Sequence, residues 1–272
     1  MNTTETWRPL IPLLLFLLLT DGGYSDSRQD ESTEEVAVQE LQPSHRPARR
    51  AATAVLHYLN YRHGSPNLIF GLGAVTGARL QKISEHGNKY SINFTVKDEV
   101  TSQTVGTCIG EVLFQKMKQN PITNVNCKFE RDKRSVLDAD KKFFEEMKKK
   151  EKPVVGQDIP DSFGHVEPFM EPVWHLAKIG SSYIMWKKST EVLQYNMVQV
   201  KHVKQRKRTD NLIEFDFKIL LHELPTQEIV PCDMSLVWHP LQLPKVRYSC
   251  THLQSDGSGL EQVQEGAVGG TA

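Results

Sequence analysis

The chain carries the same pattern of apolar and polar positions twice. Residues 89–96 and 212–219 alternate polar and apolar side chains, which predicts strands with one buried face. Each alternating stretch is followed by two strand-like segments that carry one cysteine apiece. These segments are residues 108–114 and 125–127 in the first copy and residues 232–238 and 248–250 in the second. We therefore expect two copies of one antiparallel unit.

Each copy begins with a helical pattern. Apolar residues recur at helical spacing between positions 51 and 59, and again between 173 and 184, directly after Pro172. Proline suits the first turn of a helix, because its missing N–H would have no partner there. A strand is predicted after each helix, over residues 68–80 and 193–203. The predicted order in both copies is a helix and then four strands in a meander.

A third helix is predicted between the two copies. Ser135 and Asp138 have the spacing of a capping box, in which the two side chains accept hydrogen bonds from free backbone N–H groups at the helix start. Phe143 and Met147 belong to an apolar face, and the lysine-rich residues 148–152 end the helix. We attribute these lysines to the negative end of the helix dipole rather than to a ligand.

The fold class expected from these patterns is α+β. Each of two tandem lobes is a helix packed on an antiparallel meander sheet, and a linker helix joins the lobes. The leader and the tail show no apolar periodicity and are predicted to be disordered. The predicted domains are a signal peptide (1–25), a leader (26–47), lobe 1 (48–130), a linker with a helix (131–160), lobe 2 (161–253) and a tail (254–272).

An apolar run at residues 10–19 predicts a secretory signal. It has the length of a signal-peptide core and is shorter than the ~20 residues that a membrane-spanning helix needs. We expect a secreted protein, and an uncleaved membrane anchor is the alternative. Asn93 begins an N-glycosylation sequon, in agreement with the secretory route. Residues 46–50 include a dibasic pair, which we interpret as a basic start to the first helix rather than as a processing site.

The charges of the chain balance. Lys plus Arg is 33 and Asp plus Glu is 33, so the formal net charge is zero. This balance argues against a nucleic-acid partner bound through a global positive field. One local basic cluster suggests contact with heparin or an acidic lipid surface, although we favour a solvated hairpin turn over residues 204–210. Its members are Lys201, Lys204, Arg206, Lys207 and Arg208.

Four cysteines in an oxidising compartment allow three disulfide pairings. A duplicated unit should carry its own disulfide, so the repeat favours Cys108 with Cys127 and Cys232 with Cys250. A zinc site is disfavoured because closely spaced Cys-x-x-Cys pairs are absent from the sequence.

The sequence lacks the common catalytic motifs. It contains no His-Glu-x-x-His zinc helix, no Gly-x-Ser-x-Gly elbow and no P-loop. His175 suits a hydrogen-bonded histidine at the edge of the core. His222 and Glu223 are neighbours on a strand, so their side chains point to opposite faces. We therefore expect a non-enzymatic protein that uses no cofactor and no metal.

Several segments resemble one family closely. The sequence is similar to the latexin family, in which a helix joins two cystatin-like lobes, over about residues 48–253. The signal peptide and the four cysteines point to the secreted branch of that family, which includes an eggshell matrix protein. The matching segments are residues 58–66, 159–166 (Ile-Pro-Asp-Ser-Phe-Gly-His-Val), 183–186, 220–231 and 238–240.

The resemblance implies inhibition of zinc metallocarboxypeptidases of the A type. Thr226, Gln227 and Glu228 would then enter the active-site funnel of the enzyme, because an amide or a carboxylate near the zinc can mimic a substrate terminus. Two departures from latexin accompany this loop: Thr226 replaces a usual Ser, and Cys232 replaces a Trp. The Gln-x-Val-x-Gly hairpin of true cystatins is absent at residues 84–88 and 206–210, so papain-like proteases are not expected targets.

The sequence is also compatible with two other functions. The first is a matrix or eggshell-type interaction protein without inhibitory activity. The second is a membrane-anchored regulator of growth, which would require that the apolar run at residues 10–19 is not cleaved.

Overall fold

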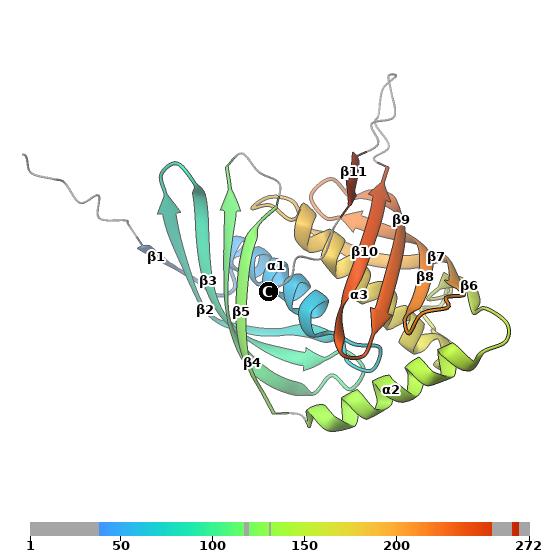
Figure 1. The fold of residues 1–272 in the computed structure, drawn as a ribbon. Helices are drawn as coiled ribbons and strands as arrows, with labels where there is room; N and C mark the ends of the chain where they lie inside the picture. The colour runs from blue at the N-terminus through green and yellow to red at the C-terminus, as the bar shows by residue number, and fades with distance from the viewer. Residues whose placement is uncertain (1–37, 117–119, 131, 252–262, 267–272) are drawn as a thin grey trace, which may run out of the picture. The chain divides into compact units, whose positions relative to one another are not determined.

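The computed structural model describes residues 38–116, 120–130, 132–251 and 263–266, all within one compact unit. The predicted signal peptide and most of the predicted leader lie outside the described residues. Two antiparallel sheets of five and six strands, each packed on a helix, form the two lobes (Figure 1). The α+β class with two helix-on-sheet lobes is confirmed.

The first lobe packs helix α1 against a sheet with the strand order β1-β2-β3-β4-β5. Strand β3 buries Ile92, Phe94 and Val96 on its inner face, in agreement with the alternation of the sequence. Gly110 on β4 lets α1 approach the sheet, since a Cβ there would lie 2.4 Å from a methyl carbon of Val55. The elements are β1 (Val38–Leu41), α1 (Arg46–His63), β2 (Phe70–Ile83), β3 (Gly87–Asp98), β4 (Thr104–Gln115) and β5 (Ile122–Phe129).

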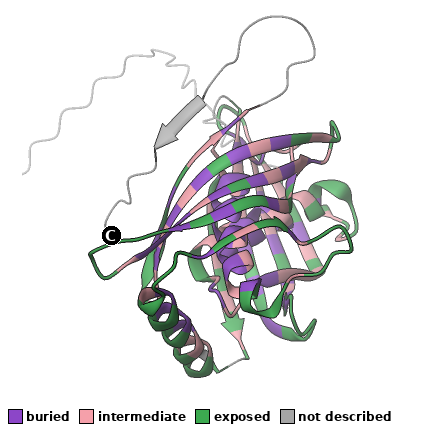
Figure 2. Cartoon of the chain, turned by 90° about the vertical axis from the view of Figure 1, so that its right-hand side faces the viewer, coloured by how far each residue is buried: buried purple, intermediate pink, exposed green. Residues whose placement is uncertain are grey.

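The second lobe repeats this arrangement with the strand order β11-β10-β9-β8-β7-β6. Helix α3 covers the inner face of the sheet, where Phe215, Ile219 and Leu221 are fully buried (Figure 2). The elements are β6 (Val155–Ile159), the short η1 (Pro168–Met170), α3 (Glu171–Lys188), β7 (Tyr195–Arg206), β8 (Ile213–Glu223), β9 (Glu228–His239), β10 (Gln242–Cys250) and β11 (Val263–Gly266).

Three short strands were not expected from the sequence. Strand β1 forms within the predicted leader, β6 within the predicted linker and β11 within the predicted tail. Each pairs with the edge of a meander, so the two sheets are wider than four strands. Strand β7 continues to Arg206, so the turn between β7 and β8 begins later than the predicted residue 204. The rest of the predicted tail lies outside the described residues.

The linker helix α2 (Lys133–Lys149) begins earlier than predicted. Its N-cap is Asp132, whose carboxylate accepts a hydrogen bond from the backbone N–H of Arg134 at 2.9 Å. The predicted capping box at Ser135 and Asp138 is therefore wrong. The hydroxyl of Ser135 instead donates to the carbonyl oxygen of Asp132 at 3.0 Å.

Both disulfides predicted from the repeat are confirmed. Cys108 on β4 and Cys127 on β5 face each other in the strand register and are bonded, and Cys232 on β9 and Cys250 on β10 do the same. One disulfide in each lobe thus cross-links the last two strands of the meander. The basic residues 46–50 form the start of α1, as the helix interpretation predicted.

Helices α1 and α3 lie side by side and join the lobes. The rings of Tyr58 and Trp186 have centroids 4.8 Å apart across this junction. His57 on α1 is hydrogen-bonded to the carbonyl oxygen of Tyr195 at 3.2 Å. Conversely, His175 on α3 of lobe 2 is hydrogen-bonded to the carbonyl oxygen of Pro66 in lobe 1 at 2.7 Å. This bond confirms the structural role that was predicted for His175.

Candidate functional site

The predicted inhibitory residues occupy the tight turn between β8 and β9. The pairing of the two strands ends at Glu223 and Glu228, which lie opposite each other. The backbone N–H of Gln227 closes the turn by donating to the carbonyl oxygen of Glu223 at 2.8 Å. Gln227 has φ = +63°, in the left-handed region that residues other than glycine adopt rarely. This conformation turns the chain back toward β9.

Side-chain hydrogen bonds hold this turn. The hydroxyl of Thr226 donates to the Glu223 carboxylate at 2.9 Å, and its oxygen lies 3.3 Å from the backbone N–H of Glu228. The amide of Gln227 donates to the carbonyl oxygen of Leu224 at 2.5 Å. Thr226 and Gln227 are exposed, and Glu228 is partly exposed. The turn is therefore a projecting surface whose shape is fixed by its own contacts.

The base of the turn is anchored in the lobe. Glu223 is buried, and the pKa of the neighbouring Tyr195 is raised by burial and by the hydrogen bond between its hydroxyl and the Glu223 carboxylate. The backbone N–H of Leu224 donates to the carbonyl oxygen of Gln194 at 2.9 Å. Farther along β9, Cys232 is bonded to Cys250. The exposed tip thus stands on a base that is buried, hydrogen-bonded and cross-linked.

Three of the five members of the basic cluster, both arginines and Lys201, form ion pairs. Arg206 forms an ion pair with Asp216, and Arg208 forms ion pairs with Asp210 and Glu214. Lys201 pairs with Asp158 on β6. Within the described residues, Lys204 and Lys207 have no ion-pair partner; both side chains are exposed. The hairpin is therefore less positively charged than its sequence suggests.

Asn93 is exposed in the middle of β3. Its side chain lies on the outer face of the lobe 1 sheet, between Gly77 on β2 and Ile109 on β4. The amide lies over Gly77, where a Cβ would be only 3.2 Å from its nitrogen. The position is accessible, and whether it is glycosylated stays a prediction.

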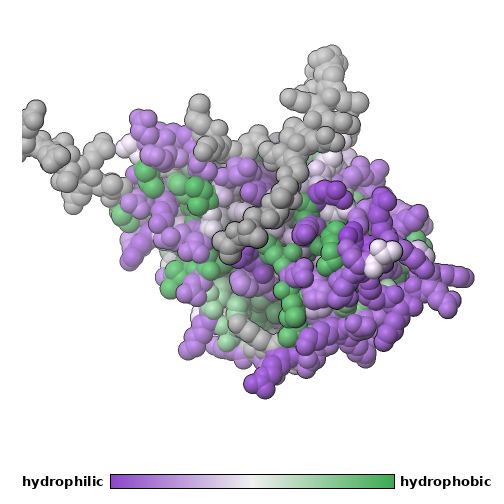
Figure 3. Space-filling model, viewed as in Figure 1, coloured by the Kyte–Doolittle hydropathy of each residue, from purple (hydrophilic) through white to green (hydrophobic). Residues whose placement is uncertain are grey.

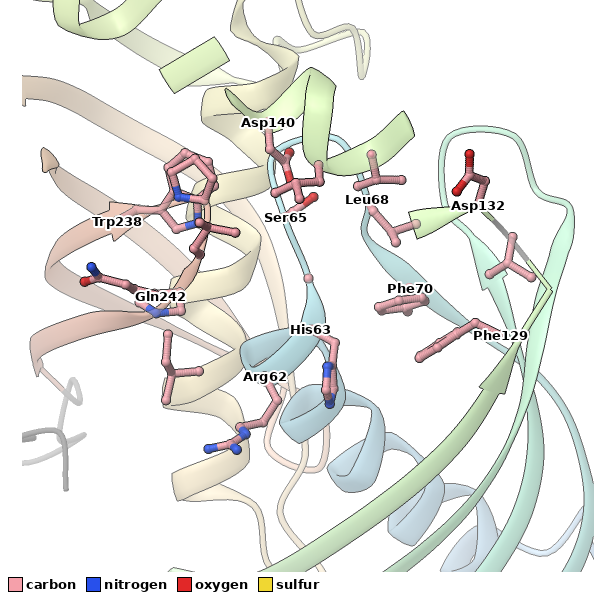
Figure 4. Close-up of a pocket in the computed structure, with 18 residues that line it drawn as sticks. Arg62, His63, Ser65, Leu68, Phe70, Phe129, Asp132, Asp140, Trp238 and Gln242 are labelled. Atoms are coloured by element: carbon pink, nitrogen blue, oxygen red, sulfur yellow. The ribbon is translucent and has the colours of Figure 1, made fainter. Parts of the chain in front are cut away.

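A pocket of about 620 Å³ lies where the two lobes and α2 meet (Figure 4). Phe70 and Phe129 stack on one side, with ring centroids 5.2 Å apart, and Trp238 lies on the other. Asp140 on α2 is buried beside Ser65, and burial raises the pKa of its carboxyl group. Asn67 donates to this carboxylate at 2.8 Å.

Sequence reasoning did not find this pocket, because its walls come from four distant segments. The sequence does contain one indication that Asp140 is buried. Asp140 lies three and four residues before Phe143 and Phe144, on the apolar face of α2, where an acidic side chain stands out. Its hydrogen bonds to lobe 1 make it part of the junction between α2 and that lobe.

The described residues show no arrangement of side chains that is typical of catalysis. All four cysteines are in disulfides, and no group of three or more His, Cys, Asp or Glu side chains converges in this part of the chain as metal ligands do. His222 and Glu223 lie on opposite faces of β8, with His222 partly exposed and Glu223 buried, as predicted from strand geometry.

Comparison with known proteins decides the family. The family model described as Latexin matches residues 41–256. The chain belongs to the latexin family. Mouse (Mus musculus) latexin is 37% identical over 77% of this chain and 95% of its own length. Chicken (Gallus gallus) ovocalyxin-32 is 36% identical over 97% of this chain and 96% of its own length.

Human (Homo sapiens) retinoic acid receptor responder protein 1 is 36% identical over 79% of this latexin-family chain and 76% of its own length. None of these three relatives has the name of an enzyme, in agreement with the expected non-enzymatic protein. The crystal structure of mouse fetuin-B is 17% identical with a TM-score of 0.30, over 81% of this chain and 72% of that one. At that score the likeness adds nothing to the fold described above.

Proposed function

We propose that this latexin-family protein inhibits zinc metallocarboxypeptidases of the A type through the turn that carries Thr226, Gln227 and Glu228. The observation that carries the proposal is the geometry of this turn. It projects two exposed side chains, and hydrogen bonds to Glu223 and Leu224 fix its backbone. A narrow active-site funnel accepts such a turn at its tip.

The fixed shape of the turn favours tight binding. A loop that is already in its bound conformation loses little conformational freedom on association. The chemistry also suits the target, since a zinc carboxypeptidase recognises the carboxylate at the end of a peptide. The Glu228 side chain also ends in a carboxylate, and the Gln227 side chain ends in an amide of similar shape. Each has an oxygen able to lie near the metal.

The proposed site of action is outside the cell. The similarity to chicken ovocalyxin-32, which extends over 97% of the chain, and the two disulfides support secretion. No helix of the described part of the chain is long and apolar enough to cross a membrane. The predicted signal peptide lies outside that part, so the membrane-anchored regulator remains the alternative to a secreted protein.

A second candidate function is an interaction with extracellular polyanions such as heparin. The observation that favours it is the pair of exposed lysines, Lys204 and Lys207, which have no ion-pair partner within the described residues. This function is compatible with the matrix protein considered from the sequence, and it does not require inhibition.

Replacement of the tip tests the inhibitory turn. We expect the variant Gln227→Ala/Glu228→Ala to weaken inhibition of a carboxypeptidase A-type enzyme at least tenfold, because it removes the polar groups that would enter the funnel. The matched control is Glu85→Ala/Gln103→Ala, which changes the same residue types at exposed positions of lobe 1. An inhibition constant that is equal in both variants and the wild type would contradict the loop assignment.

A further inference from the structure

Two basic segments that lie far apart in the sequence meet in the fold. The first is the end of α2 with the lysine-rich residues 148–152, and the second is the hairpin between β7 and β8. Lys148 donates a hydrogen bond to the backbone carbonyl oxygen of Asp210 in that hairpin. A small cavity of about 80 Å³ separates the segments and is lined by Lys148, Lys150, Arg206, Lys207 and Arg208, among others.

Buried hydrogen bonds hold the two segments in place. Gln205 on β7 is only 7% exposed, and its amide donates to the carbonyl oxygen of Met147 at 3.0 Å. Its side-chain oxygen accepts from the backbone N–H of Val154 at 3.2 Å, and its own N–H donates to the carbonyl oxygen of Val154 at 2.8 Å. Because Met147 and Val154 flank residues 148–152, the lysine segment is tied to β7 at both ends.

The lysines supply the positive charge that is available to a ligand. The carboxylates of Asp210, Glu214 and Asp216 already occupy the two arginines of the hairpin. Among the described residues, Lys150, Lys152, Lys204 and Lys207 are exposed and have no ion-pair partner. Lys150 and Lys207 line the cavity. One unpaired lysine from each segment therefore lines this small cavity, which we call the furrow.

We propose that this furrow, formed jointly by the end of α2 and the β7–β8 hairpin, binds a sulfated polysaccharide. Several ammonium groups spread over two segments match the repeated sulfates of such a polyanion, whose binding releases counterions. The surface over α2 and the neighbouring strands is mostly hydrophilic (Figure 3). A surface that inserts into a bilayer needs exposed apolar side chains between its cations, so the glycan is the favoured partner.

The furrow lies at the opposite end of β8 from the inhibitory turn. Strand β8 has 11 residues. The basic hairpin precedes its N-terminal end, and the turn with Thr226 and Gln227 follows its C-terminal end. At ~3.3 Å per residue, about 35 Å separates the two sites. The glycan and a protease therefore bind at the same time, a consequence that rests on the proposed inhibitory function.

Heparin affinity tests the composite site independently of inhibition. Wild-type protein should bind immobilised heparin at 0.15 M salt and elute as the salt rises. The variants Lys150→Ala/Lys152→Ala and Lys204→Ala/Lys207→Ala should each weaken binding at least fivefold. The matched control, Lys82→Ala/Lys97→Ala, removes two exposed lysines of lobe 1 and should leave the affinity unchanged.

Three results would overturn the composite site. The first is a loss of affinity in the hairpin variant with none in the α2 variant, because the hairpin alone would then suffice. The second is an equal loss in the lobe 1 control, which indicates a response to net charge only. The third is binding to phosphatidylserine vesicles without binding to heparin.

A separate assay tests the independence of the two ends. Saturating heparin should leave the inhibition constant for the carboxypeptidase unchanged within twofold. If heparin competes with the enzyme, the spatial argument is wrong although the furrow itself still binds glycan. If the wild type binds heparin and inhibits no carboxypeptidase, the proposed inhibitory function fails and the glycan site stands.

Discussion

Single residues at the lobe junction carry properties that the sequence pattern does not reveal. His57 is buried between α1 and the start of β7, and its hydrogen bond to the carbonyl oxygen of Tyr195 joins the lobes. Burial lowers its pKa from 6.5 to about 4, against the smaller opposing effect of that hydrogen bond. The pKa of His175 is lowered for the same main reason. Both histidines are therefore neutral in the folded protein near pH 7.

The His57 shift predicts a loss of stability in acid. Between pH 6.5 and pH 4 the unfolded chain binds a proton at His57 that the folded protein does not, so the free energy of unfolding falls as the pH falls. The loss at His57 reaches roughly 3 kcal/mol near pH 4. Urea unfolding of the wild type and of His57→Gln at pH 7.5 and pH 4.5 measures it. An equal pH dependence in the two proteins would contradict the assignment.

At the scale of elements, the residue that caps the N-terminus of α2 differs from the one that the sequence predicts. The sequence offers Ser135 and Asp138 as a capping box, whereas Asp132 is the observed N-cap. We expect Asp132→Ala to lower the free energy of unfolding by about 1 kcal/mol, because a backbone N–H of the first turn loses its acceptor. Ser135→Ala should change it by less than half of that amount. If urea unfolding shows a larger loss of stability for Ser135→Ala than for Asp132→Ala, the cap predicted from the sequence would be correct after all.

The missed elements are those without a buried face of their own. The long strands could be predicted because one side of each packs on a helix, as Phe94 and Phe215 do. Strand β1, by contrast, has three exposed residues of four, and most of β6 is exposed. Such edge strands form through backbone hydrogen bonds to a neighbour, so they leave no alternation in the sequence.

At the scale of the whole molecule, the repeat predicted two lobes and their disulfides but not how the lobes meet. The junction uses residues that the repeat does not relate, such as Tyr58 and Trp186, whose rings meet at a tilted angle. Also between the lobes, Glu191 accepts hydrogen bonds from Asn88 at 2.8 Å and from Tyr90 at 2.6 Å. The composite basic furrow and the lobe-junction pocket both arise from such long-range contacts.

The location of the candidate turn could be predicted only through the family resemblance. The residue types of Thr226, Gln227 and Glu228 are ordinary for a polar turn, and nothing in their spacing indicates a protease partner. The structure adds the exposure of the tip and the hydrogen bonds that fix it. The opposite positions of this turn and the basic furrow on β8 then define two ends of one lobe with separate proposed roles.

The decisive test of the proposed function is the inhibition of a carboxypeptidase A-type enzyme by the purified wild-type protein. The exposed, hydrogen-bonded turn predicts that enzyme activity is lost as the protein is titrated against nanomolar enzyme, and that a small ligand of the zinc site competes with the protein. Full enzyme activity in the presence of micromolar protein would contradict inhibition through this turn.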